Sequence, residues 1–212
     1  MMSPARQVRP MILAAASGVA GIDEAGRGPL AGPLAVAAVL LDPRRPIPGL
    51  DDSKKLTASR RDELYVRIMA EAEAVSLVFM STDDIAALNI RGATLAGMRR
   101  AAHALSPAAT AFVIDGRDVP PGLPAPASAI IGGDGRYAAI AAASIIAKVA
   151  RDRAMLALAN DYPGYGFEQH MGYGTKRHLQ ALRRLGPTPI HRAGFAPVAD
   201  ALRLRQSSAA TC

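Results

Sequence analysis

Residues 18–41 read Gly18-Val-Ala-Gly-Ile-Asp-Glu-Ala-Gly-Arg-Gly-Pro-Leu-Ala-Gly-Pro-Leu-Ala-Val-Ala-Ala-Val-Leu-Leu41. The first part is apolar up to Ile22 and predicts a strand over Gly18 to Ala25. A turn of glycine and proline follows, and the uninterrupted apolar run Leu34 to Leu41 predicts a second, buried strand. The short connection predicts that the two strands pair like a hairpin. This segment therefore predicts the start of a sheet.

The rest of the chain alternates between apolar runs and helical spacing, which predicts a sheet covered by helices. Because later strands follow helices, we expect a mixed sheet of five strands, an α/β fold class, with a helical C-terminal region. The further predicted strands are Val75 to Met80, Ala111 to Ile114 and Ala127 to Ile131. The predicted helices are Ala58 to Ala74 behind an N-cap at Thr57, a short helix from Thr82, Arg91 to Leu105, Tyr137 to Asn160, Thr175 to Leu185 and Val198 to Arg205, with a loop at 162–173.

The domain organisation follows from length and composition. The chain has 212 residues, half of them apolar, which is enough for one large domain. We expect a partly disordered lead-in at 1–17, one domain at 18–205 that includes the helical end from about 171, and a disordered tail at 206–212. The apolar stretch 11–20 is too short for a membrane span, which needs about 20 residues.

Charge and cysteine content indicate the setting in which the protein works. The net charge is +7, and residues 171–212 hold seven Lys or Arg against a single acid, Asp200. A basic end suggests a polyanion partner, although a solvated helix surface has the same composition. The single cysteine, Cys212, excludes an internal disulfide and suits a reducing compartment. We expect a cytoplasmic monomer without a membrane partner.

Acidic residues follow three of the predicted strands. Asp23 and Glu24 end the first strand, Asp115 ends the fourth, and Asp134 comes just after the fifth. In a helix-flanked sheet, that edge is where ligands usually bind. Any one of these acids alone is more simply read as a turn former or a helix cap. Their repetition at three strand ends predicts that the four carboxylates converge.

Converging carboxylates repel one another unless a cation lies between them. Oxygen ligands without histidine or cysteine suit Mg²⁺ or Mn²⁺. Two such ions, about 4 Å apart, can support phosphodiester cleavage. Adjacent strand residues point to opposite faces, so a bulge or a strand end must re-aim Asp23 or Glu24 if both bind metal.

The glycine-rich turn Gly26-Arg27-Gly28-Pro29-Leu30-Ala31 matches the spacing of a dinucleotide-binding loop. Such a loop opens a helix, whereas Pro33 and a strand-like run follow here. The acids before the turn would also repel a pyrophosphate. We therefore reject that interpretation and expect a turn that lets a nucleic-acid strand approach the backbone, with Arg27 free to contact phosphate.

Several blocks of sequence together resemble bacterial ribonuclease HII, in the family's order and over roughly residues 18–198. They are Gly21-Ile-Asp-Glu-Ala-Gly-Arg-Gly-Pro-Leu-Ala-Gly-Pro33, Asp52-Ser-Lys-Lys-Leu56, Val113-Ile-Asp-Gly116, Gly132-Gly-Asp134, Ala141-Ala-Ala-Ser-Ile-Ile-Ala-Lys-Val149 and Gly172-Tyr-Gly-Thr175. The resemblance implies a ribonuclease H-like fold. It also implies hydrolysis of the RNA strand of RNA–DNA hybrids, and nicking 5′ to ribonucleotides embedded in DNA, with 5′-phosphate and 3′-hydroxyl ends.

The resemblance also implies roles for individual residues. Asp23, Glu24, Asp115 and Asp134 match the family's catalytic acids, which hold two Mn²⁺ or Mg²⁺ ions with substrate. Gly26, Arg27 and Gly28 match the turn that senses the ribonucleotide 2′-hydroxyl, and Tyr173 matches the tyrosine that packs on the next sugar. Phosphate contacts are expected from Lys54, Lys55, Ser144, Lys148, Lys176, Arg177, His178 and Arg184.

For Lys148 the alternative is a lysine that extends its charge from a buried helix to solvent, and the sequence favours the phosphate contact only slightly over it. The chain departs from the family pattern at three positions outside the acids. Arg117 stands where relatives often have Asn, Met171 where Lys is usual, and Gly194 where Ser is usual. These departures affect the expected grip on substrate only.

Three other functions are weighed against this one. A type HIII ribonuclease usually lacks the Gly-Arg-Gly turn and has Glu at the position of Asp134. A transposase or junction resolvase shares clustered acids but not the Gly-Tyr-Gly-Thr block after a long helix. A non-catalytic nucleic-acid-binding module has no need of four acids facing a polyanion. The sequence thus favours a ribonuclease of the HII type.

Overall fold

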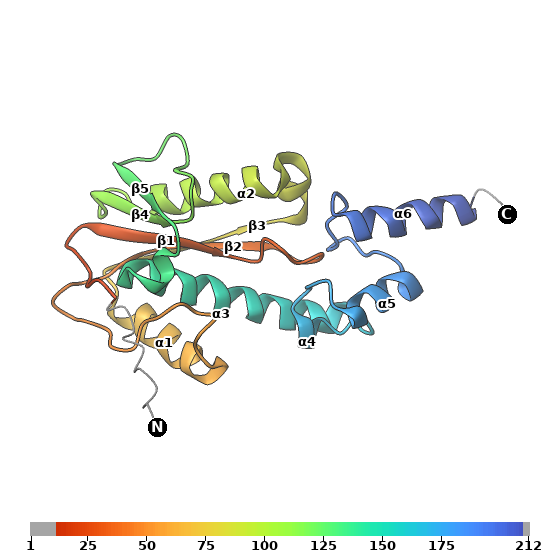
Figure 1. The fold of residues 1–212 in the computed structure, drawn as a ribbon, viewed down its shortest axis with the longest axis horizontal. Coiled ribbons are helices and arrows are strands. Elements are labelled where there is room, and N and C mark those ends of the chain that lie inside the picture. Colours follow the sequence, from red (N-terminus) through yellow and green to blue (C-terminus); the bar gives the residue numbers. More distant parts are fainter. Residues whose placement is uncertain (1–11, 210–212) are drawn as a thin grey trace, which may run out of the picture.

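The computed structural model describes residues 12–209 and has a mixed five-stranded sheet with the strand order β3-β2-β1-β4-β5 (Figure 1). β1 pairs antiparallel with β2, and β2 with β3, whereas β1–β4 and β4–β5 are parallel. The predicted α/β class, the mixed sheet and the hairpin-like first pair are confirmed. The strands are β1 Val19–Ala25, β2 Leu34–Leu40, β3 Ala74–Met80, β4 Ala111–Asp115 and β5 Ala127–Ile130.

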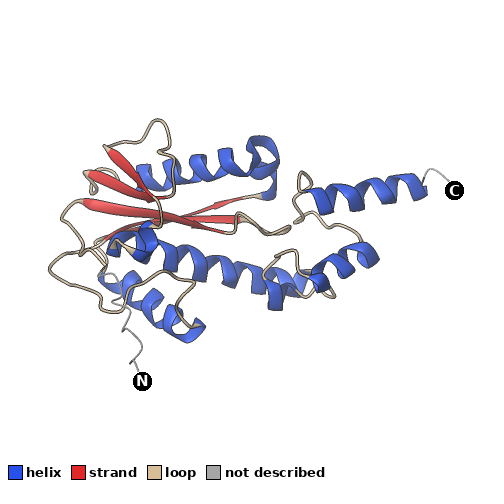
Figure 2. Ribbon diagram, viewed as in Figure 1, coloured by secondary structure: helices blue, strands red, loops and turns tan. Residues whose placement is uncertain are grey.

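Helices cover both faces of the sheet, α2 on one side and α1 with α3 on the other, as the colouring of Figure 2 also shows. α5 and α6 extend beyond one end of the sheet (Figure 1). The helices are α1 Ala58–Glu71, α2 Thr82–Ala104, the 3₁₀ turn η1 Gly133–Gly135, α3 Ala138–Asp161, α4 Phe167–His170, α5 Lys176–Leu185 and α6 Ala196–Ala209.

β2 is apolar throughout because both of its faces are covered. Val36 and Ala38 belong to the core cluster that includes α2 residues, and Ala37 and Val39 belong to the cluster formed with α1 and α3. Side chains of a strand alternate between faces, so a strand between two helical layers needs apolar residues at every position. β2 is therefore the central element of the core.

α3 lies unusually close to β1, and Gly21 makes this possible. A Cβ atom on Gly21 would lie 2.1 Å from the carbonyl carbon of Ala139 and 2.3 Å from the backbone nitrogen of Ile140. Small side chains on α3 allow the same approach from the helix side, and most of the first half of this helix is buried. The prediction of a largely buried alanine-rich helix is confirmed.

The two helices predicted between 82 and 105 form one element with a kink. Asn89 has a φ of 54° inside α2, and its Oδ1 accepts hydrogen bonds from the backbone N–H groups of Arg91 and Gly92. Its ψ of 170° lies outside the left-handed helical well, so the helix is interrupted at Asn89, and the Asn89 side chain caps the helical turns that follow. The short helix α4 was not predicted, because four residues are too few to show a period.

Both chain ends differ partly from expectation. Residues 1–11 of the predicted lead-in lie outside the described residues, but Leu13 forms a parallel bridge with Tyr137. The prediction of disorder from Gln206 is wrong for residues 206–209, which continue α6; the Ser207 hydroxyl donates to the carbonyl of Arg203 within this helix. Residues 210–212 lie outside the described residues. None of the helices within residues 12–209 has the length and apolar character needed to cross a bilayer.

Candidate active site

Three carboxylates meet at one edge of the sheet. Single oxygen atoms of Asp23, Asp115 and Asp134 all lie within 4.8 Å of one another. Asp23 lies on β1 and Asp115 ends the neighbouring parallel strand β4, one position beyond the register pair Ile22–Ile114. Asp134 comes from η1, after β5. The convergence predicted from the strand ends is therefore present for three of the four acids.

Backbone hydrogen bonds orient these carboxylates. The N–H of Gly133 donates to Asp115 Oδ1 at 2.7 Å, and the N–H of Gly135 donates to Asp134 Oδ1 at 3.0 Å. A Cβ on Gly133 would lie 2.5 Å from Ile140 Cδ1, so glycine lets this turn approach both the helix and the acid. The Gly-Gly-Asp sequence thus places Asp134 beside the strand ends.

The electrostatics of the cluster favour a bound cation. Burial, then repulsion from Glu24 and Asp115, holds the pKa of Asp23 well above its ordinary value. Burial, then repulsion from Asp52 and Asp115, raises the pKa of Asp134. A divalent ion between the carboxylates would remove this repulsion, and an all-oxygen donor set suits Mg²⁺ or Mn²⁺. The residues present fit a divalent metal site.

Glu24 lies outside the group of three. β1 keeps regular pairing with β2 at both Asp23 and Glu24, so no bulge re-aims either side chain. Glu24 instead forms an ion pair of 3.7 Å with Arg27 and lines a shallow pocket together with Asp115 and Asp118. Burial raises the pKa of Glu24, and the charge of Arg27 opposes this. Glu24 is thus a neighbour of Asp115 outside the group of three, and its expected part in the metal site stays a prediction.

Two lysines of the Asp52-Ser-Lys-Lys block lie against acids. The ammonium of Lys54 is 3.5 Å from Asp134 Oδ2 and 4.0 Å from Asp52 Oδ1, and its side chain is 78% exposed. Lys55 pairs with Asp51 at 3.4 Å. Lys54 is therefore the lysine that the structure places at the acid cluster.

Ser144 and Lys148 have partners within the protein. Ser144 is buried, and its hydroxyl donates to the Ser53 hydroxyl at 2.7 Å. Lys148 donates to Asp152 at 2.8 Å on the same helix. Lys148 thus agrees with the alternative interpretation, in which a lysine extends its charge from a buried helix. Ser144 faces the interior instead of the surface.

The basic helix α5 exposes Lys176, Arg177 and Arg184, as expected of residues that grip a nucleic-acid backbone. Arg177 also lies 3.9 Å from Glu168. His178 is fully buried, so its expected phosphate contact is wrong. The helical spacing of His178 with the buried residues Ala181 and Leu182 is the signal that would have identified it as a core position.

The Gly-Arg-Gly turn and Tyr173 come together beside the acids on β1. Tyr173 is 44% exposed, and its ring carbon Cε1 lies 3.7 Å from the position of a Cβ on Gly28. The N–H of Leu30 donates to the carbonyl of Gly172 at 2.8 Å, which ties the two loops together. An exposed aromatic ring next to a glycine turn forms a surface on which a sugar can pack.

Two buried arginines beneath these loops were missed in the sequence. Arg151 and Arg192 are each 1% exposed and donate to backbone carbonyls of the loops. Arg151 stands on α3 next to the charged residues Asp152 and Arg153, so the sequence around it does not distinguish a buried arginine from an exposed one. Arg192 lies in a loop that carries no local sign of its partners.

A chain of two histidines holds the backbone behind Tyr173. His178 Nδ1 donates to the carbonyl of Tyr173 at 2.9 Å, which leaves His178 Nε2 to accept from His191 Nε2 at 3.1 Å. His191 Nδ1 then accepts from the backbone N–H of Thr188 at 2.9 Å. Both rings must be neutral for this pattern. His191 is a loop histidine whose two ring nitrogens both have hydrogen-bond partners.

This histidine pair predicts loss of stability in acid. Burial, then the neighbouring His178, lowers the pKa of His191 to about 4, and burial lowers that of His178. In the unfolded chain both titrate near 6.5, so the unfolded state binds more protons below that pH. The free energy of unfolding should fall as the pH drops from about 6.5 towards 4, by up to about 1.4 kcal/mol per pH unit for each histidine.

Urea unfolding between pH 7 and 5 measures this slope. His191→Asn should make the dependence on pH shallower than in the unsubstituted chain. His103→Asn is the matched control, because His103 is exposed and bonds only the carbonyl of Gly122. An unchanged slope in His191→Asn would contradict the assignment of neutral, buried rings.

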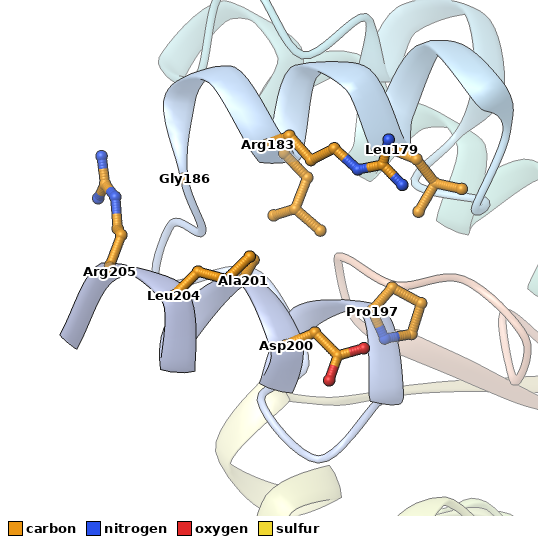
Figure 3. Close-up of a pocket in the computed structure, with 9 residues that line it drawn as sticks. Leu179, Arg183, Gly186, Pro197, Asp200, Ala201, Leu204 and Arg205 are labelled. Atoms are coloured by element: carbon orange, nitrogen blue, oxygen red, sulfur yellow. The ribbon is translucent and has the colours of Figure 1, made fainter. Parts of the chain in front are cut away.

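A separate groove lies between α5 and α6 (Figure 3). Its volume is about 420 Å³, and none of the clustered acids lines it. Leu179, Pro197 and Leu204 contribute apolar surface, and Arg183 and Asp200 contribute charges (Figure 3). This groove is thus distinct from the acid cluster.

The sequence of this chain is similar to known proteins along nearly its whole length. A family model described as Ribonuclease HII matches residues 20–198. The chain is 55% identical over 193 residues to a Ribonuclease HII of Xanthomonas oryzae pv. oryzae, covering 91% of this chain and 77% of the relative. It is 52% identical to a Ribonuclease HII of Burkholderia ambifaria over 190 residues, 90% and 87% of the two chains.

Solved structures show the same fold. Ribonuclease H2 from Pyrococcus horikoshii superposes with a TM-score of 0.74 at 27% identity, over 88% of this chain and 98% of that one. Bst ribonuclease HIII in complex with Mn²⁺ superposes with a TM-score of 0.65 at 20% identity, over 91% of this chain and 71% of that one. The likeness of the fold thus covers most of this chain.

Proposed function

This chain belongs to the ribonuclease HII family, and we propose that it hydrolyses the RNA strand of RNA–DNA hybrids and nicks duplex DNA 5′ to an embedded ribonucleotide. One observation of the structure carries the proposal. Three acids with a donor set suited to divalent metal occur together with an exposed Tyr173 ring that lies 3.7 Å from where a Cβ on Gly28 would be. A metal centre and a reader of the sugar are the two parts that such a reaction needs.

We propose that Asp23, Asp115 and Asp134, joined by Glu24, would hold two Mn²⁺ or Mg²⁺ ions. When bound, such ions would supply the activation of water and the stabilisation of the leaving oxygen that phosphodiester hydrolysis requires. The products would carry 5′-phosphate and 3′-hydroxyl ends. Lys54, whose ammonium lies 3.5 Å from Asp134 Oδ2, offsets part of the negative charge of the acids.

We propose that substrate selection is the work of the two loops. The backbone of Gly26, Arg27 and Gly28 would contact the 2′-hydroxyl, which is the local mark that separates RNA from DNA. The ring of Tyr173 would pack on the sugar that follows. Lys176, Arg177 and Arg184 would hold the backbone of the duplex and supply affinity that depends on salt. Action in the cytoplasm, as a monomer, stays a prediction.

The rates on three duplexes test this function. We expect cutting of a duplex with one ribonucleotide and of a long RNA–DNA hybrid in Mg²⁺ or Mn²⁺, and no measurable cutting of an all-DNA duplex of the same sequence. Equal cutting of the all-DNA duplex would overturn the proposal. Retained binding without any cutting in either metal would favour a non-catalytic nucleic-acid-binding module.

Tyr173→Ala is expected to lower the rate on the single-ribonucleotide duplex about 5- to 100-fold. Stacking on an aromatic ring contributes about 1–3 kcal/mol by alanine substitution, and about 1.4 kcal/mol is a factor of ten in rate. Tyr173→Phe keeps the ring and is the matched control, for which we expect nearly unchanged cutting. The same rate in Tyr173→Ala and in the unsubstituted enzyme would refute the packing role.

A further inference from the structure

Two buried arginines hold the substrate-reading loops from below. Arg192 donates to the carbonyls of Gly26 at 2.7 Å, Arg27 at 3.0 Å, Gly32 at 3.0 Å and Pro33 at 3.2 Å. In the described part of the chain, no ion pair includes Arg192 or Arg151. Arg192 is therefore a buried cation whose partners are backbone carbonyls.

Arg151 extends the same arrangement to the loop that carries Tyr173. It donates to the carbonyls of Pro33 at 3.0 Å, Met171 at 3.0 Å and Ala31 at 3.2 Å. Its guanidinium carbon lies 5.9 Å from the centre of the Tyr173 ring. The carbonyl of Pro33 accepts from both arginines, so one shared acceptor links the Gly-Arg-Gly turn to the tyrosine loop.

The direction of these carbonyls fixes the direction of the N–H groups that follow them. In a trans peptide unit the C=O and the N–H point to opposite sides. Because the carbonyls of Gly26 and Arg27 point inward to Arg192, the N–H groups of Arg27 and Gly28 point away from it. Arg192 therefore orients two backbone donors of the turn towards the side on which a nucleic acid would lie.

A stability role alone does not explain two buried cations without carboxylates. Burial and the charge of Arg151 lower the pKa of Arg192 to about 9, which reflects the unfavourable environment. Burying a charge without a counter-charge costs free energy, and only the hydrogen bonds to the loop carbonyls offset that cost here. The planar guanidinium, with five donors in a fixed fork, is instead suited to holding several carbonyls in one geometry.

We propose that Arg192 and Arg151 are positioning residues that hold the Gly-Arg-Gly turn and Tyr173 in the relative placement needed to read a ribonucleotide followed by a deoxyribonucleotide. This inference rests on the proposed function. A long hybrid presents a 2′-hydroxyl at every position, so a displaced turn still finds one. A single embedded ribonucleotide requires the turn and the tyrosine to be in register, and its cutting depends on both arginines.

The test is the ratio of the rates on the single-ribonucleotide duplex and on the long hybrid. Arg192→Lys keeps the positive charge but replaces the planar guanidinium, with its fixed N–H donors, by a single ammonium group. We expect the ratio to fall at least about tenfold. Arg153→Lys is the matched control: Arg153 lies exposed on α3, pairs with Asp62, and should leave the ratio unchanged. Thermal unfolding of each variant identifies losses that come from the fold alone.

Chemical rescue separates positioning from general damage. Millimolar guanidinium should restore the ratio in Arg192→Ala but have no effect on Arg153→Ala. If Arg192→Lys does not fold, a cycle of Arg151→Lys with Tyr173→Ala takes its place. In that cycle the double variant should lose little more than the larger single effect, because both act through the same ring.

Each outcome bears on one proposal. An unchanged ratio in folded Arg192→Lys, no rescue by guanidinium, or additive effects in the cycle would each overturn the positioning role. If the unsubstituted enzyme cuts neither the single-ribonucleotide duplex nor the hybrid, the proposed function itself fails. The two failures are thus distinguishable within one experiment.

Discussion

Asp23→Asn is expected to lower the rate of metal-dependent cutting at least about 100-fold while binding of the duplex is retained. Asp23 is buried and lies on β1, the middle strand of the sheet. Metal ions contribute several kcal/mol of transition-state stabilisation, and about 1.4 kcal/mol is a factor of ten in rate. Single-turnover cleavage of a duplex with one ribonucleotide, beside a binding assay, measures both effects.

The control for this substitution is Asp62→Asn, because Asp62 is exposed on α1 and pairs with Arg153. Its cutting rate should match that of the unsubstituted enzyme. Full activity of Asp23→Asn would show that the acid cluster is not the catalytic centre.

The same substitution should stabilise the metal-free protein. Asparagine removes a buried carboxylate whose pKa is raised by burial and by repulsion from Glu24 and Asp115. Each pKa unit of such a shift corresponds to about 1.4 kcal/mol, or about 3–6 °C in Tm for a chain of this size. We expect a higher Tm for Asp23→Asn in chelator. Addition of Mn²⁺ should narrow or reverse the difference, because the metal stabilises the native state it binds.

Gly21→Ala is expected to destabilise the fold by at least about 3 kcal/mol, a drop of roughly 6–12 °C in Tm. The new methyl group would lie 2.1 Å from a backbone carbon of α3, where no side chain can move aside. β1 and α3 would have to separate, and Asp23 on β1 would shift away from Asp134. Thermal or urea unfolding of the purified protein measures the loss.

Gly194→Ala is the matched control for this prediction. A Cβ at Gly194 would have no atom within 4 Å, and its φ lies outside the left-handed region. Its free energy of unfolding should stay within about 0.5 kcal/mol of the unsubstituted chain. Equal stability of Gly21→Ala and Gly194→Ala would contradict the close approach of β1 and α3.

The sequence predicts the fold well where its signals are local. The uninterrupted run Leu34 to Leu41 predicted a strand covered on both faces, and β2 is that strand. The acids at three strand ends predicted a convergence that Asp23, Asp115 and Asp134 show. The alternation of side chains along a strand is enough to predict the first feature, and the tendency of ligand-binding residues to follow strand ends is enough to predict the second.

Other features depend on partners far away in the chain. Each carbonyl that Arg192 binds belongs to a residue about 160 positions earlier, and nothing near Arg192 indicates this. Glu24 follows Asp23 on a regular strand and lies outside the group of three, beside Asp115 at the small pocket that both residues line. The burial of His178 follows from its helical spacing with Ala181 and Leu182, whereas the many basic residues of α5 favoured the wrong prediction of a phosphate contact.

The most direct test of the account is the position of the cut in a duplex with one ribonucleotide, mapped with and without Mn²⁺. We expect a single nick on the 5′ side of the ribonucleotide, with a 3′-hydroxyl on one fragment and a 5′-phosphate on the other, and no cut in the presence of a chelator. Cutting at unrelated positions, or cutting that persists in chelator, would contradict it.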